Sequence, residues 1–224
     1  VSDADATNSM CAGEILADVY ENQGDGEAWK ALIERLGLSF SHATAVGERA
    51  YLRARSMFSN SYGQPRAGLA DALQALRNAP PGVESQRAAQ RAVYCCVAMG
   101  SPRQGLPYAR RALAEAEGFP RLEVRSMRAL GTTLTWLGES EDAIRYHQRC
   151  LAICRDKGLY ARNAIAYHDL GDAHRVSGAG QAASEAYELA LSHAERMSLG
   201  HTMELVRVKL VMCTLTDGKT DGVT

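Results

Sequence analysis

Residues 127–151, MRALGTTLTWLGESEDAIRYHQRCL, and residues 167–191, YHDLGDAHRVSGAGQAASEAYELAL, decide the fold, because they repeat one pattern 40 residues apart. Nine positions of the first copy recur at the same offsets in the second. They are Met127, Leu130, Gly131, Leu134, Gly138, Ala143, His147, Cys150 and Leu151, followed by Tyr167, Leu170, Gly171, His174, Gly178, Ala183, Tyr187, Ala190 and Leu191. Apolar and small residues at helical spacing on both sides of a glycine predict two helices joined by a short turn.

The turn glycine recurs along the whole chain. It stands at Gly24, Gly63, Gly100, Gly138 and Gly178, with gaps of 39, 37, 38 and 40 residues. Periods of about 20 to 50 residues are typical of stacked-repeat proteins. The sequence therefore predicts an all-α solenoid of about five helical hairpins, closed by one capping helix over about 201–216. We expect a flexible N-terminus at 1–9, one continuous solenoid at 10–216 and a disordered tail at 217–224.

Composition narrows the class of protein further. The 25 basic and 26 acidic residues give a formal charge of -1, so the chain as a whole has no attraction for nucleic acid or for an anionic membrane. No apolar run is long enough to span a membrane, and the six cysteines are sparse for 224 residues. These features favour a soluble protein of the reducing cytoplasm. The chain begins with Val1, which fits either a fragment or a processed product.

The spacing resembles that of tetratricopeptide repeats, whose pattern is Trp-x2-Leu-Gly-x2-Tyr followed by Ala-x3-Phe-x2-Ala. The chain has Tyr167-x2-Leu170-Gly171-x2-His174, then Ala183-x3-Tyr187-x2-Ala190. The resemblance covers about 10–216 and implies a right-handed superhelix that binds a protein or peptide without catalysis. The period of 37 to 40 residues exceeds the usual 34. Arrays in bacterial transcriptional activators and signalling proteins are similar, whereas HEAT-type repeats lack this grid.

In tetratricopeptide proteins the first helix of each hairpin lines a concave groove, and the resemblance places the binding residues of this chain there. Five of them are arginines, which suit an acidic peptide segment or a carboxylate through paired hydrogen bonds. The alternative is that these arginines are solvated or paired with Glu and Asp. The predicted groove residues are Arg53, Arg87, Gln90, Tyr94, Arg125, Arg128, Thr132, Trp136, His168, Asp172 and Arg175.

The N-terminal repeat places Glu14, Asp18 and Glu21 on its own inner face. Opposite charges at the two ends of a groove would orient an extended ligand. The simpler interpretation is that these acids solvate the cap of the solenoid.

Metal binding and catalysis are not favoured. His147, Cys150 and Cys154 have the spacing of soft metal ligands, but they continue an apolar stripe and are expected to be core residues. The chain lacks a nucleophile elbow, a phosphate loop and a dinucleotide motif, and no helix resembles a DNA-recognition helix. We expect no enzyme activity, no cofactor, no metal and no direct nucleic-acid contact. An acid–base pair of His168 and Asp169 is the weak exception.

Two other functions stay open at this point. The same groove could hold a small molecule or signalling peptide in the sensor domain of a larger transcriptional regulator. An enzyme with a non-obvious site between repeats is the second alternative, and self-association of the chain is compatible with all three interpretations.

Overall fold

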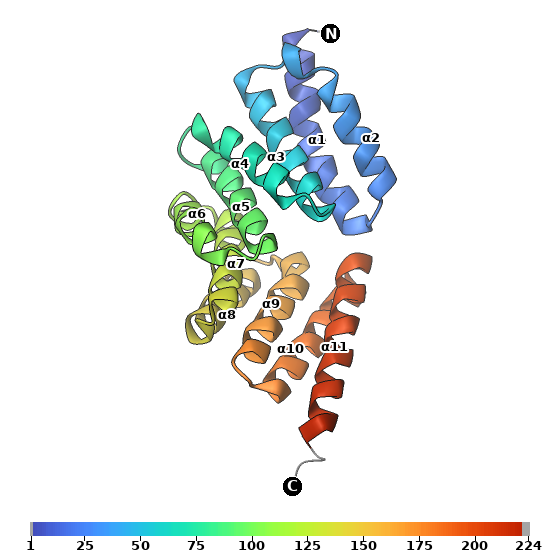
Figure 1. Ribbon diagram of the computed structural model, residues 1–224, viewed down its shortest axis with the longest axis vertical. Coiled ribbons are helices and arrows are strands. Elements are labelled where there is room, and N and C mark those ends of the chain that lie inside the picture. Colours follow the sequence, from blue (N-terminus) through green and yellow to red (C-terminus); the bar gives the residue numbers. More distant parts are fainter. Residues whose placement is uncertain (1, 221–224) are drawn as a thin grey trace. The chain divides into compact units, whose positions relative to one another are not determined.

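The computed structural model describes residues 2–220, without the side chains of residues 22, 161 and 216–220, and this part of the chain is helical with no strand (Figure 1). Its α-helices are α1 (Asp3–Gln23), α2 (Gly26–Gly37), α3 (Ala45–Ser61), α4 (Pro65–Arg77), α5 (Val83–Ala98), α6 (Pro102–Ala114), α7 (Pro120–Leu137), α8 (Ser140–Asp156), α9 (Asn163–Val176), α10 (Gly180–Arg196) and α11 (Gly200–Thr220). Two short 3-10 helices, η1 (Phe40–His42) and η2 (Tyr160–Arg162), lie between hairpins. The predicted all-α class is confirmed.

Consecutive helices pair as α1/α2, α3/α4, α5/α6, α7/α8 and α9/α10, and each pair is in contact. The recurring glycine ends the first helix of every pair. Its φ is positive at all five positions, from 67° at Gly100 to 81° at Gly178. Side chains with a Cβ rarely adopt this conformation, which is why glycine recurs there. The prediction of five hairpins followed by one further helix is thus confirmed.

The two helices of a hairpin approach closely where the sequence places a second glycine. A Cβ added to Gly131 would lie 2.6 Å from Cε1 of His147, and one added to Gly171 would lie 2.5 Å from Cε1 of Tyr187. Both rings are fully buried. These glycines therefore let a large ring of the second helix lie directly on the backbone of the first.

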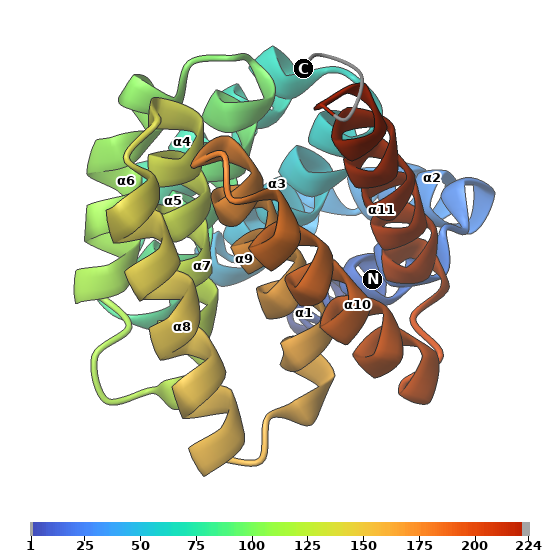
Figure 2. The ribbon, with the colours of Figure 1, turned by 90° about the horizontal axis from the view of Figure 1, so that it is seen from below.

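Contacts divide the chain into two compact units, unit 1 (Val1–Glu117) and unit 2 (Gly118–Thr224). In unit 1, Met10 and Ala17 pack with Trp29 and Tyr51 in one core. In unit 2, α10 contacts both α9 and α11 (Figures 1 and 2). The sequence predicted one continuous body, because the repeat period runs on without interruption past the junction of these units.

The predicted ends of the solenoid need correction. Residues 3–9, expected to be flexible, are the first turns of α1, where the Ser2 side chain accepts a hydrogen bond from the backbone N–H of Asp5 and Met10 is fully buried. The predicted tail begins at 217, whereas α11 continues to Thr220. The rest of that tail, 221–224, lies outside the described residues.

Candidate functional site

Within each unit the first helices of the hairpins lie side by side, and they carry every residue that the sequence places in the groove. In unit 1, α1 contacts α3, and α3 contacts α5. In unit 2, α7 contacts α9, and α9 contacts α11. We call these surfaces the first-helix layers of units 1 and 2. Arg53, Arg87, Gln90 and Tyr94 belong to the first layer, and the other predicted residues belong to the second.

Arg53 of α3 forms a buried ion pair with Glu14 of α1. Nε of Arg53 donates to Oε1 of Glu14 at 2.7 Å, and Nη2 donates to Oε2 at 2.8 Å. The two residues are only 3% and 6% exposed. A paired arrangement of this kind satisfies both carboxylate oxygens and repays part of the cost of burying the charges. The Arg53 side chain therefore links α3 to α1.

Arg91 of α5 also pairs with an acid of α1, Asp18, at 2.9 Å between Nη2 and Oδ1. Burial alone would lower the pKa of the Arg91 guanidinium, but the carboxylates of Asp18, Glu21 and Glu14 outweigh burial and raise it. The acids of α1 therefore do not simply solvate the end of the chain. Glu14 and Asp18 neutralise arginines that stand 39 and 73 residues further along.

Arg87 is held more loosely than its neighbours. Its Nη1 lies 3.4 Å from Oε2 of Glu14, which already accepts the shorter bond from Arg53. Its side chain is 38% exposed, and its buried Nε has no hydrogen-bond partner among the described residues. Arg87 is thus partly available to a ligand.

Two polar side chains follow Arg87 on α5. Gln90 is 2% exposed and its Nε2 lies 3.5 Å from the hydroxyl of Tyr94, which is half-buried. Spacings of three and four residues place Arg87, Gln90 and Tyr94 on one side of the helix. These three predicted residues are brought together by the fold.

In unit 2, Arg128 of α7 forms a buried pair with Asp169 of α9, at 2.7 Å between Nε and Oδ2. Burial alone would raise the pKa of the Asp169 carboxyl, but the guanidinium of Arg128 outweighs burial and holds the pKa well below its usual range. Nδ1 of His168 lies 3.2 Å from the other oxygen of Asp169. His168 is itself 7% exposed, so the possible acid–base pair of His168 and Asp169 is buried and committed to this cluster.

Asp172 of α9 connects three elements of unit 2. Its Oδ1 accepts a hydrogen bond from the Tyr187 hydroxyl of α10 at 2.7 Å and from Nζ of Lys209 of α11 at 2.8 Å. Nε of Arg175 lies 3.8 Å from the same oxygen. Sequence reasoning missed Lys209 and Tyr187 as partners, because Lys209 lies in the capping helix and Tyr187 occupies a core position of the repeat.

The remaining predicted residues lie on α7. Arg125 and Thr132 are half-buried, whereas Trp136, in the last turn, is 64% exposed. Trp136 is therefore the aromatic side chain of this group that offers most contact area to a partner.

Metal binding finds no support in the geometry. Among residues 2–220 with described side chains, no three His, Cys, Asp or Glu groups are arranged to hold a metal ion. Sγ of Cys150 donates to the backbone carbonyl of Val124 at 3.4 Å, and burial raises the pKa of the Cys150 thiol to about 12. A buried thiol of this kind behaves as a small apolar side chain.

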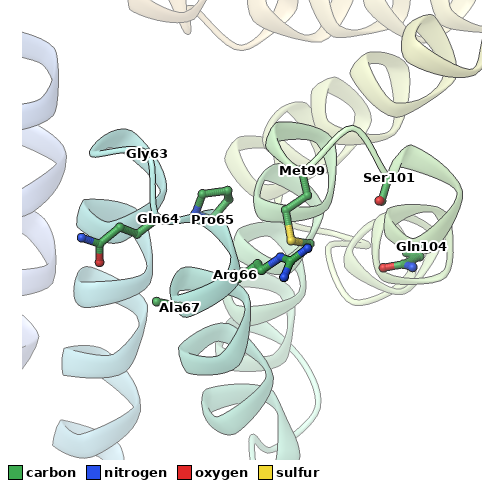
Figure 3. Close-up of a pocket in the computed structure, with 8 residues that line it drawn as sticks. All are labelled: Gly63, Gln64, Pro65, Arg66, Ala67, Met99, Ser101 and Gln104. Atoms are coloured by element: carbon green, nitrogen blue, oxygen red, sulfur yellow. The ribbon is translucent and has the colours of Figure 1, made fainter.

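A cavity of about 670 Å³ lies in unit 1, away from every predicted groove residue (Figure 3). It is formed where the turn after α3 and the start of α4 meet the end of α5 and the start of α6. Its lining residues are Gly63, Gln64, Pro65, Arg66, Ala67, Met99, Ser101 and Gln104. The sequence contains no motif that would have indicated it.

The family profile of tetratricopeptide repeats matches residues 122–196, which contain the two clearest copies of the pattern. The match covers about a third of the chain. Solved structures share the fold over most of the chain, at low sequence identity. No curated protein matches the chain in sequence.

The fold resembles that of a Rap protein solved in complex with Competence and Sporulation Factor, with a TM-score of 0.74 and 16% identity over 86% of this chain. The apo form of RapI gives a TM-score of 0.60 and 16% identity over 77% of the chain. A putative kinesin light chain with TPR-like repeats, from Podosopora anserina, gives a TM-score of 0.56 and 14% identity. The match covers 76% of this chain and 87% of the kinesin light chain structure. The chain spans 55% of the Rap protein and 65% of RapI.

Within the part of the chain that the structure describes, no helix is long and apolar enough to cross a membrane.

Proposed function

We propose that this chain is a non-catalytic module of bacterial regulation or signalling that binds an acidic protein or peptide segment on the first-helix layer of unit 1. The contact that carries this proposal is Arg87. The side chains of Arg53 and Arg91 are only 4% and 11% exposed and form short bonds to acids of α1, whereas Arg87 is 38% exposed and shares Glu14 with Arg53 at 3.4 Å.

The local charge supports an anionic ligand at Arg87. Glu14 and Glu84 face three arginines, because Glu84 accepts from Nε of Arg49 and lies 3.9 Å from Nη1 of Arg53. Arg49 and Arg53 each have a closer acid than Arg87 has, so Arg87 is the least neutralised of the three. A carboxylate of the ligand would complete its neutralisation with a charge-assisted hydrogen bond.

The residues beside Arg87 suit an extended segment. The Tyr94 ring, two turns further along α5, is half-buried and offers apolar area to such a segment. The Rap protein, solved with a bound factor, supports the view that such repeats serve to bind a partner. The likeness at 16% identity concerns the fold, so the acidic character of the ligand is argued from Arg87 alone.

Arg87→Glu is expected to weaken binding by about 10- to 100-fold, because a hydrogen bond to a charged group contributes about 1.5–3 kcal/mol and the variant also repels an acid. Peptides would be selected from a random displayed library on the full chain. Their affinities for the wild type and the variant would then be measured by fluorescence anisotropy. We expect the selected peptides to be rich in Asp and Glu.

Arg110→Glu is the matched control, since Arg110 is exposed on α6 and the substitution changes the net charge by the same amount. It should leave the affinity unchanged. Equal binding by Arg87→Glu and the wild type would contradict the proposed contact, and a library that yields no binder would contradict the peptide-binding function.

A sensor of a small molecule is a second candidate, favoured by the cavity shown in Figure 3. Its volume falls in the range of about 300–1,000 Å³ that is typical of small-molecule sites. A ligand that prefers the folded state raises the melting temperature. A metabolite that does so for the wild type but not for Ala67→Trp, which would fill the cavity, supports this candidate.

A further inference from the structure

His147 of α8 occupies an apolar site that leaves its ring without hydrogen bonds. The residue is 0% exposed and its ring lies on the backbone of Gly131 in α7. Neither Nδ1 nor Nε2 has a hydrogen-bond partner within the described residues. A neutral imidazole has one N–H donor and one acceptor, so it tolerates this site better than an imidazolium with two donors and a charge.

None of the charged groups near His147 forms a hydrogen bond with its ring. α7 contributes Arg128, which is itself positive, and α9 contributes His168, Asp169 and Asp172. Asp169 already accepts from Arg128 and lies against Nδ1 of His168. Asp172 accepts from Tyr187 and Lys209. On α8, the thiol of Cys150 bonds to the carbonyl of Val124.

Burial of the His147 ring makes the packing of α8 on α7 less stable in acid. Burial lowers the pKa of His147 from 6.5 to about 4, with Asp169 opposing this shift and Arg128 adding to it. An opened hairpin would take up the proton below about pH 6.5, whereas the packed hairpin does not do so until about pH 4. Acid between these values therefore favours the opened hairpin.

The next repeat contains a natural counterpart that does not titrate in this range. Tyr187 stands 40 residues after His147 and lies on Gly171 in the same way. It is also fully buried, and its hydroxyl donates to Asp172. The two hairpins thus differ at one equivalent position in their response to a proton.

We propose that His147 is an acid-sensitive switch that loosens the packing of α8 on α7 in mildly acidic solution, while α10 stays packed on α9. The loosened hairpin includes Thr132 and Trp136 of the first-helix layer of unit 2. The switch does not depend on the ligand proposed for unit 1.

The test compares hydrogen exchange of α8 and α10 amides in the full chain at pH 7 and pH 5, corrected for the intrinsic pH dependence of exchange. Protection of α8 is expected to fall by about 20-fold, the factor given by the two pKa values above. Protection of α10 should fall less, because Tyr187 does not titrate in this range and the histidines of that hairpin whose pKa values burial lowers, His174 and His193, are only half-buried. His147→Tyr, which copies the counterpart, should remove the fall in α8, and an equal fall in that variant or in α10 would overturn the proposal.

A second measurement keeps the test decisive if His147→Tyr does not fold. The imidazole resonances of His147 in the wild-type chain can be followed by NMR as the pH is lowered. They should stay those of a neutral ring to below pH 5. A midpoint near pH 6.5 would overturn the proposal.

Discussion

Arg128→Met is expected to destabilise unit 2 by about 3–5 kcal/mol, because it leaves the carboxylate of Asp169 buried without its partner. Urea unfolding at pH 7 measures the loss through the transition midpoint. Arg145→Met is the matched control. Arg145 pairs with Asp142 on the surface, with 75% of its side chain exposed, and its loss should cost no more than about 1 kcal/mol.

Two further results would identify the buried charge as the cause. Asp169→Leu added to Arg128→Met should restore much of the stability, since an apolar pair can replace a buried ion pair. In the wild type the pKa of Asp169 lies below its usual range, so the pair contributes stability at neutral pH and loses it as the pH falls through that low pKa. The deficit of Arg128→Met should therefore shrink in acid. A loss no larger than that of Arg145→Met would contradict this account.

Gly171→Ala is expected to destabilise unit 2 by about 3 kcal/mol, by forcing α9 and α10 apart. The new Cβ would lie 2.5 and 2.6 Å from Cε1 and Cδ1 of Tyr187, a fully buried ring whose hydroxyl is also held by Asp172. The ring cannot swing away without losing that bond. Thermal unfolding followed by circular dichroism measures the effect.

The sign of this result is informative, because alanine is normally the better helix former by about 1 kcal/mol. Gly200→Ala is the control, since Gly200 begins α11 and a Cβ there meets nothing within 4 Å. That variant should be neutral or slightly more stable. If Gly171→Ala were equally well tolerated, the close approach of the two helices would be wrong.

The hairpins were predictable because their determinants are local. A glycine with positive φ is needed at the end of the first helix, and a second glycine is needed where a ring crosses the backbone. Both requirements recur at the repeat period and can be read from one sequence. The boundaries were less accurate, because the burial of Met10 that helps anchor the start of α1 depends on α2 and α3.

The sequence predicted which helices carry the candidate residues, but not which acids those residues pair with. Position in the repeat placed Arg53, Arg87 and Arg128 on first helices, as the structure confirms. The place of a residue in the repeat does not predict that Arg53 and Arg128 form buried ion pairs with Glu14 and Asp169. These partners stand 39 and 41 residues away, and their distance depends on how neighbouring hairpins stack.

The sequence by itself determined an all-α chain of repeated hairpins, because turn glycines, small residues and apolar stripes act within a single repeat. Only the tertiary structure decided which arginines are buried in ion pairs, that Arg87 stays partly exposed, and that His147 is fully buried. Burial and ion pairing are properties of the space between helices. That space exists only after residues far apart in the sequence have been brought together.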